Sequence, residues 1–98
     1  MKKIDAINAV VNDGMKLKEL DSRSRNNKEV VLAAVKNNGL ALKYASTSLK
    51  NDKEVVLTAV KNNIEALGSA SMGVVVNNPE IGFYMKSYAE KYFPETVK

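Results

Sequence analysis

Three glutamates recur in register along this 98-residue chain and are the carboxylates whose spacing could support chemistry. Glu29, Glu54 and Glu80 each occupy the second position of a predicted helix. Two carboxylates act as general acid and base when a cleft brings them together and raises the pKa of one. Acidic residues in a first turn also stabilise a helix by facing its positive end. We favour this electrostatic role for all three glutamates.

Other arrangements with catalytic or metal-binding chemistry are missing from the sequence. The chain has no Cys and no His, which excludes thiolate and imidazole metal sites and catalytic Ser-His or Cys-His pairs. Asp13, Glu19 and Asp21 lack the spacing of a calcium loop, and residues 68–73 lack the Gly-Lys-Ser/Thr of a phosphate loop. The sequence therefore predicts a protein that is not an enzyme and that uses no cofactor and no metal.

Basic residues gather in the first half of the chain. The net charge is +4 overall, and residues 1–50 carry the whole excess. Five of these cations lie within thirteen residues: Lys16, Lys18, Arg23, Arg25 and Lys28. Such a set could contact phosphates, but no aromatic residues interleave with it and carboxylates are mixed into it. We favour a solvated face over a nucleic-acid-binding surface.

An internal repeat organises the chain. The segment KEVVLAAVKNN over 28–38 returns as KEVVLTAVKNN over 53–63, with ten identities in eleven positions at a spacing of 25 residues. Over 28–52 against 53–77 the comparison gives 14 identities in 25. Equivalent lysines, such as Lys36 and Lys61, should therefore stack into ladders along one edge.

The first helix of each unit has clear starting signals. Asn27, Asp52 and Asn78 are N-cap candidates. Pro79 follows the last of them at the first helical position, where proline is favoured. The apolar run over 30–35 is too continuous for a helix that is buried on one side only. It predicts a helix packed between neighbours on both sides.

A turn and a second helix are predicted to complete each unit. Gly39 should end the first helix by adopting a positive φ. A second helix is predicted over 40–46, followed by a connection over 47–52. Ile64 stands where the next unit would have this glycine, so the turn there is predicted to differ or to be strained.

The whole chain, residues 1–98, is predicted to form one all-α domain of stacked helix pairs with a period of about 25 residues. A degenerate unit over 3–27 precedes the units 28–52 and 53–77, and a half unit over 78–93 follows as a C-terminal capping helix. Terminal units are atypical because one face has no neighbour. The expected shape is a small α-solenoid-like rod that is stabilised by burial between units.

The string KEVVLAAVKNNGLALKYAS, with its second copy introduced by LKNDKEVVL, resembles a family of tandem short α-helical repeats that is catalogued as a domain of unknown function. The resemblance is close over 28–71. It implies an all-helical array and supplies no activity, ligand or catalytic residue. Residues 64–65 and 68–73 depart from the pattern, so an irregular second helix is expected there.

Most of the aromatic residues lie near the C-terminus. Tyr84, Tyr88 and Tyr92 recur at intervals of four residues on one face of a predicted helix, and Phe83 and Phe93 lie beside them. Such a face could seal the end of the array. It could also bind a partner, because exposed tyrosines are frequent hot spots in protein interfaces. Both roles remain open for this helix.

We predict a non-catalytic module that acts by binding another protein. The three tyrosines would anchor the partner, and three lysines would steer an acidic patch on it: Lys36, Lys43 and Lys61. A nucleic-acid-binding protein that uses the basic N-terminal half is the alternative, and self-association through an imperfectly capped end is a further possibility. No segment approaches the roughly 18 apolar residues that span a bilayer, so we expect no membrane partner and a cytoplasmic location.

Overall fold

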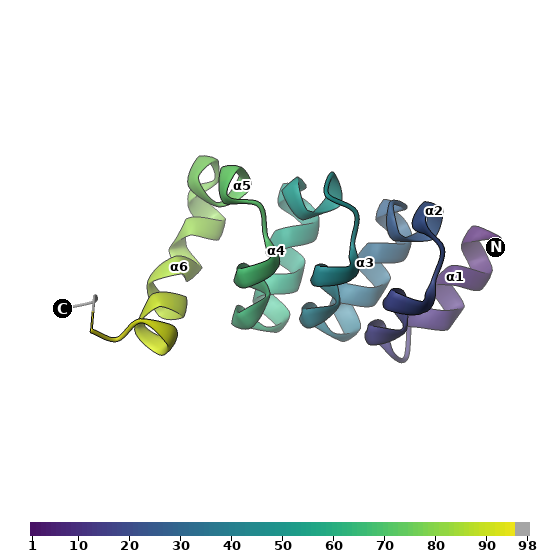
Figure 1. Ribbon diagram of the computed structural model, residues 1–98, viewed down its shortest axis with the longest axis horizontal. Coiled ribbons are helices and arrows are strands. Elements are labelled where there is room, and N and C mark those ends of the chain that lie inside the picture. Colours follow the sequence, from purple (N-terminus) through teal and green to yellow (C-terminus); the bar gives the residue numbers. More distant parts are fainter. Residues whose placement is uncertain (96–98) are drawn as a thin grey trace.

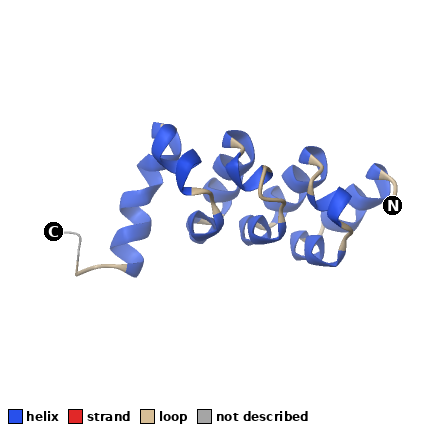
Figure 2. Cartoon of the chain, turned by 45° about the horizontal axis from the view of Figure 1, so that its top comes forward, coloured by secondary structure: helices blue, strands red, loops and turns tan. Residues whose placement is uncertain are grey.

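The computed structural model describes residues 1–95, and every regular element within that range is a helix (Figures 1 and 2). The longer elements are the α-helices that begin the repeated segments, and they comprise α1 (Lys3–Val10), α3 (Lys28–Asn37), α4 (Lys53–Asn62) and α6 (Pro79–Tyr92). They lie side by side along a rod with extents of 48 × 23 × 17 Å (Figure 1). The prediction of an all-α array is confirmed. We call this row of helices the α layer.

A second layer of 3₁₀-helices packs against the α layer and faces the viewer in Figure 1. This 3₁₀ layer comprises η1 (Gly14–Glu19), η2 (Gly39–Tyr44) and η4 (Ile64–Ser69). Three short helices then lead to the next long helix, namely α2 (Ser22–Arg25), η3 (Leu49–Asn51) and α5 (Met72–Asn77). The predicted second helix over 40–46 is thus a tighter 3₁₀-helix that begins one residue earlier.

The irregular second helix that was expected after residue 63 is not observed. Ile64–Ser69 forms a 3₁₀-helix of the same length as Gly39–Tyr44. The small residues after it enter α5, where Val74 and Val75 are buried. That expectation was wrong because apolar packing, rather than local composition, decides the structure of this segment.

The starts of the long helices follow the predicted capping pattern in two cases out of three. Asn27 Oδ1 accepts hydrogen bonds from the amides of Glu29 and Val30 at 3.0 and 3.2 Å. Asp52 caps α4 by accepting from the amide of Val55 at 3.2 Å. Asn78 was expected to do the same for α6, and this was wrong. Its Nδ2 instead donates to the carbonyl of Val74 at 2.8 Å, which ties the end of α5 to the start of α6.

Gly39 serves a different purpose from the one predicted. No residue of the described range 1–95 has a positive φ. A Cβ atom on Gly39 would lie 2.3 Å from the carbonyl oxygen of Ala59, and one on Gly14 would lie 2.2 Å from that of Ala34. Glycine is required because the 3₁₀-helix of one unit approaches the α-helix of the next closely. The same approach thus occurs at both glycines, which are 25 residues apart.

The turn before Ile64 is neither different nor strained. Asn38 and Asn63, which precede the two 3₁₀-helices, have φ/ψ of −148/107° and −152/115°. Each side chain accepts a hydrogen bond from the amide two residues later, at 3.0 Å and 2.9 Å. No described residue of this turn has a positive φ, so the local backbone accepts an L-residue such as Ile64 after the asparagine.

Asparagines at the ends of the α-helices join neighbouring units. The Oδ1 atom of Asn37 accepts from the amide of Gly14 at 2.8 Å, and that of Asn62 accepts from Gly39 at 2.6 Å. Asn62 Nδ2 also donates to the carbonyl of Lys36 at 3.2 Å. These bonds fix the register between units, and the sequence analysis did not anticipate them.

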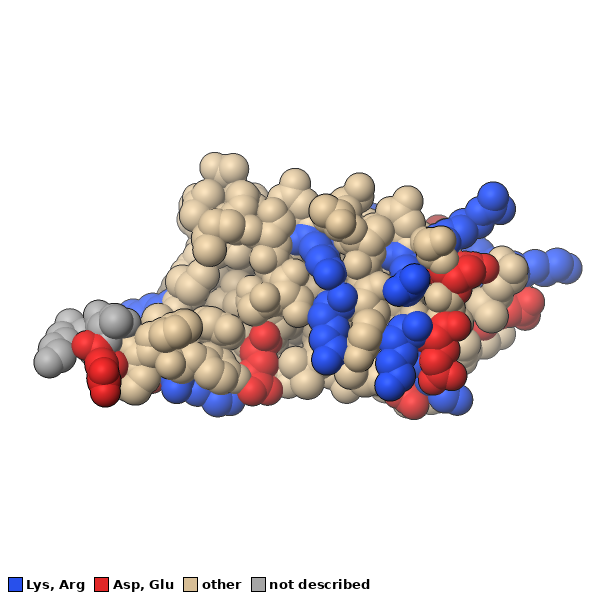
Figure 3. All heavy atoms as spheres, viewed as in Figure 1, with Lys and Arg blue, Asp and Glu red and all other residues tan. Residues whose placement is uncertain are grey.

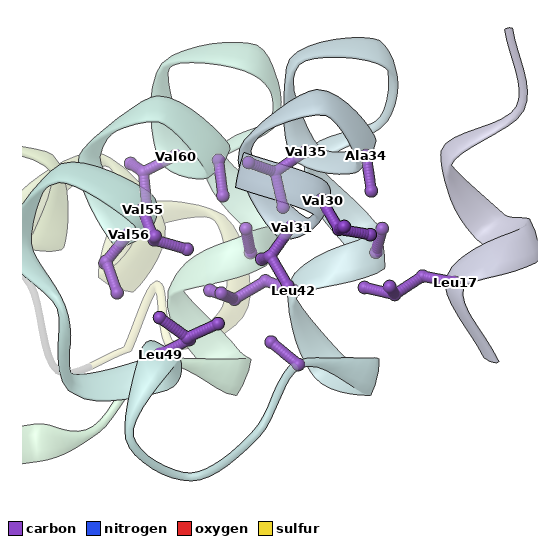
Figure 4. Packing of buried hydrophobic residues seen from close by; sticks show 14 of the residues in the cluster. Leu17, Val30, Val31, Ala34, Val35, Leu42, Leu49, Val55, Val56 and Val60 are labelled. Atoms are coloured by element: carbon purple, nitrogen blue, oxygen red, sulfur yellow. The ribbon is translucent and has the colours of Figure 1, made fainter. Parts of the chain in front are cut away.

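The hydrophobic core runs along the rod between the two layers. Figure 4 shows valines of α3 and α4 beside Leu42 and Leu49 of the facing segments. In the run over 30–35, four residues are buried, while Leu32 and Ala33 are only half-buried. The α3 helix is therefore covered by its neighbours on most sides and keeps one face towards solvent.

Candidate protein-binding surface

A ladder of ion pairs crosses the units and uses all three recurring glutamates. The lysine at the first position of each long helix pairs with the glutamate at the second position of the next. The pairs are Lys3 with Glu29 at 3.0 Å, Lys28 with Glu54 at 3.0 Å and Lys53 with Glu80. Hydrogen bonding to Glu54, and then to Asp52, raises the pKa of Lys28. These glutamates are therefore charge-neutralised as well as placed at helix starts.

A groove of about 570 Å³ opens on the outer face of the α layer, between α1 and α3. Apolar residues form most of its lining, which comprises Ile7, Val11, Glu29, Leu32, Ala33, Lys36 and Asn37. Within it, Ile7 and Leu32 are half-buried and pack against the core. The carboxylate of Glu29 is held by Lys3, so the groove combines an apolar floor with an uncompensated lysine, Lys36.

The floor of this α1–α3 groove belongs to a longer apolar row. Ile7, Leu32 and Leu57 are the fifth residues of α1, α3 and α4, and Phe83 is the fifth residue of α6. The first three are half-buried, whereas the Phe83 side chain is 78% exposed. Within residues 1–95, no helix follows α6 to cover Phe83. This row escaped the sequence analysis, although the shared fifth position was visible in the repeat.

Two of the three predicted steering lysines border this row. Lys36 and Lys61 follow Leu32 and Leu57 by one helical turn and are exposed. Among the described residues, neither of these two lysines has a carboxylate within ion-pair distance. Neighbouring helices lie about 8–10 Å apart, so the two ammonium groups form a positively charged rim beside the apolar row.

Lys43 does not join the other two predicted lysines. It lies on η2, where its Nζ is 5.1 Å from the ring centroid of Tyr44. The α layer and the 3₁₀ layer face one another through the core, so their exposed side chains point in opposite directions. Figure 3 shows the 3₁₀ side of the molecule, with Lys and Arg gathered over its middle and N-terminal parts.

The predicted tyrosines lie together on α6 and contact the rest of the array to different degrees. Tyr84 and Tyr88 are half-buried and pack against the core. The rings of Tyr88 and Tyr92 lie 4.7 Å apart, and the Tyr92 hydroxyl donates to the Glu65 carboxylate. These contacts are those expected of a helix that seals the C-terminal end of the array. Nothing in this geometry tests their binding role, which remains a prediction.

The bond between Tyr92 and Glu65 leads to a prediction about ionisation. This hydrogen bond favours the neutral phenol and raises the pKa of Tyr92 to about 12. A titration followed by phenolate absorbance should show one tyrosine ionising near pH 12, and Glu65→Gln should return it towards 10. Because the folded pKa exceeds the unfolded one, the bond stabilises the fold below pH 10, and this contribution is lost as the pH rises through 12.

The control for that titration is Glu90→Gln, which removes a carboxylate from α6, the helix that carries Tyr92. Glu90 is exposed on α6, and its removal should leave the high-pH step in place. An identical titration curve for Glu65→Gln and the unmodified protein would contradict the assignment.

The fold defines this protein as an all-helical array of short tandem units. Its sequence matches the model of a family described as a domain of unknown function, DUF4116, over residues 6–50 and again over 27–72. The chain belongs to this family. The two matches overlap, in keeping with the internal repeat. No curated protein and no solved structure gave a significant match.

Two further findings bear on the kind of site. No helix of residues 1–95 is both long and apolar enough to cross a membrane. In the same range, no group of three or more acidic side chains is arranged to hold a metal ion.

Proposed function

We propose that this protein is a non-catalytic module that binds an acidic, amphipathic helix of another protein along the apolar row of the α layer. One observation carries the proposal. The α1–α3 groove has an apolar floor at Ile7 and Leu32, and Lys36 is its uncompensated charge because Lys3 neutralises Glu29. An apolar floor with a positive rim is complementary to a helix with apolar and acidic stripes.

The spacing of the row suits such a partner. The row residues lie on neighbouring helices, which pack about 8–10 Å apart. A partner helix rises about 1.5 Å per residue, so side chains seven residues apart are separated by about 10 Å. A helix lying along the row would therefore present one apolar anchor to each unit. Phe83, the most exposed member, lies at the C-terminal end of this path.

The charges would act on encounter and orientation more than on total affinity. Lys36 and Lys61 are solvent-exposed, so each contributes modestly to affinity and its effect weakens with salt. The partner would supply Asp or Glu beside its apolar stripe. This proposal retains two of the predicted lysines and places Lys43 outside the contact. The tyrosines of α6 support the end of the array.

A peptide-display selection tests the proposal while the natural partner is still unidentified. The probe is a library of helical 16-residue peptides selected against the intact protein. We expect enrichment of Leu, Ile or Phe at intervals of three, four and seven residues, with Asp or Glu beside them. Amide chemical shifts of the protein should change over α1 and α3 when a selected peptide is added.

Paired charge reversals provide the matched control. The double variant Lys36→Glu/Lys61→Glu should weaken the selected peptide about tenfold or more, equivalent to about 1.4 kcal/mol. Lys18→Glu/Lys43→Glu makes the same charge change at the same 25-residue spacing in the 3₁₀ layer and should leave binding nearly unchanged. Selection of basic peptides, or equal losses for both double variants, would refute the proposed surface.

A further inference from the structure

We infer that a second groove, on the 3₁₀ side of the rod, binds a single phosphate monoester group through Arg25. The groove has a volume of about 220 Å³ and lies between α2 and the end of η2. Its lining comprises Ser22, Arg25, Tyr44, Ala45, Ser46 and Thr47. We call it the α2–η2 groove. This inference is independent of the proposed function, since it concerns the opposite layer.

Arg25 provides the main reason to expect an anion. Its Nε is buried and has no hydrogen-bond acceptor, and it is the sole side-chain nitrogen or oxygen with these properties in the part of the chain that the structure describes. A buried N–H without an acceptor is costly, and a shift of the side chain that brings this N–H to an oxyanion in the groove would remove the cost. The planar guanidinium offers two parallel N–H groups to a phosphate.

The walls of the α2–η2 groove are held in place by bonds of their own. The amide of Ser46 donates to the carbonyl of Arg25 at 2.9 Å. The Ser46 hydroxyl donates to Asn26 Oδ1 at 2.6 Å and accepts from the amide of Leu49 at 3.3 Å. These bonds connect α2 with the segment after η2, so the groove is formed before a ligand arrives.

Free hydroxyl groups complete the set of donors. Within residues 1–95, the side chains of Ser22 and Thr47 make no hydrogen bond. Ser46 already uses its proton, so it is not counted as a donor. One guanidinium and two hydroxyls can reach several oxygens of a tetrahedral group, whereas a carboxylate offers only two oxygens. The donor set therefore favours a phosphate monoester.

The local charge also favours an anion. Lys43 and Lys50 lie close in the chain to lining residues of the groove, and Figure 3 shows Lys and Arg side chains on this face of the molecule. Asp21 is the carboxylate next to Ser22, and it accepts from the amide of Ser24 at 2.8 Å and lies 3.7 Å from the amino group of Met1. Its charge is thus partly balanced within the fold.

The repeat supplies a natural comparison for this groove. One unit later, Lys50 replaces Arg25 and Met72 replaces Thr47. The backbone bond is retained, since the amide of Ser71 donates to the carbonyl of Lys50 at 2.9 Å. The later position therefore keeps the wall geometry but loses the guanidinium and one hydroxyl. We expect it to bind phosphate more weakly.

The test follows the Arg25 side chain directly by NMR in the intact protein. Four probes are titrated: inorganic phosphate, a phosphoserine peptide, its unphosphorylated twin and a single-stranded oligonucleotide. Phosphate-bearing probes should shift the Nε–Hε signal of Arg25 and the amides of residues 22–25 and 44–47. Binding of phosphate alone would identify the free ion as the source, and tighter binding of the phosphopeptide would identify a modified side chain.

Two variants distinguish the contribution of the guanidinium geometry to phosphate binding from that of positive charge alone. Arg25→Lys, which copies the later unit, should weaken phosphate binding about tenfold because it retains charge but loses the paired N–H groups. Lys50→Gln removes a nearby charge and should have a much smaller effect. An unmoved Arg25 Nε–Hε signal in the unmodified protein would overturn the inference even if a variant failed to fold. Equal binding of the unphosphorylated twin, or oligonucleotide shifts spread along the whole 3₁₀ layer, would also overturn it.

Discussion

Gly39→Ala should destabilise the array by about 2–3 kcal/mol, an effect typical of severe overpacking. The added Cβ would lie 2.3 Å from the carbonyl oxygen of Ala59, which is a backbone atom of α4. Relief would require one unit to move away from the next, and this would also strain the bond from the Gly39 amide to Asn62. Thermal unfolding followed by circular dichroism should show a midpoint lower by about 10 °C or more.

Gly73→Ala is the matched control for this substitution. The nearest atoms to its added Cβ are side-chain oxygens at 3.8 Å, and the residue is exposed on α5. Alanine is favoured over glycine in a helix by about 0.5–1 kcal/mol, so this variant should be neutral or slightly more stable. Equal melting temperatures for the two variants would show that the close approach at Gly39 does not constrain the fold.

Val55→Asp should be more damaging still, with a loss of about 3–5 kcal/mol or failure to fold. Val55 is the third residue of α4 and is completely buried. An acidic residue at this position is locally favourable for a helix start, so the loss would report burial against the preceding unit. Circular dichroism and amide dispersion in NMR spectra would measure it.

The first helix provides a matched control for Val55→Asp. Asp5 is the third residue of α1, where no described unit precedes it, and it is exposed. Asp5→Val exchanges the same two residue types in the opposite direction and should change the free energy of unfolding by less than about 0.5 kcal/mol. A cooperative melt of Val55→Asp close to that of the unmodified protein would mean that the interface between units is not tightly packed.

These two substitutions bear on the proposed groove as well as on stability. The apolar row depends on a constant offset between neighbouring units, which the glycine approach and the asparagine bonds maintain. If Gly39→Ala separates two units, the anchors at Leu32 and Leu57 move apart. Peptide binding should then fall together with stability, whereas the charge reversals at Lys36 and Lys61 should affect binding alone.

Several elements could be predicted from the sequence because their signals act within a few residues. The starts of α3 and α4 follow from Asn27 and Asp52, whose side chains cap the first turn. The first helical position of Pro79 is equally local. Because the internal repeat places the same signals in successive units, each local prediction also applies to the equivalent segment of the next unit. The all-α class could therefore be inferred from a single sequence.

The candidate site was only partly predictable, because sequence signals act within a few residues whereas the site combines residues of several units. The periodicity of α3 and α4 indicated that Lys36 and Lys61 are equivalent, and both are exposed. Their separation from Lys43 depends on how the two layers face each other. The exposure of Phe83 depends on the absence of a further helix after α6 within residues 1–95, and the lack of an acceptor for Arg25 Nε depends on the groups around it.

The sequence by itself determined the helical repeat, its period and the local starts of its helices. The tertiary structure decided which contacts these residues make with the neighbouring units. Gly39 is required by a carbonyl twenty residues away, Asn62 accepts from that same glycine, and the ladder lysines meet carboxylates of the next unit. Capping and periodicity act within one or two turns, whereas these contacts arise only when units stack, since packing brings together residues that lie about one repeat apart.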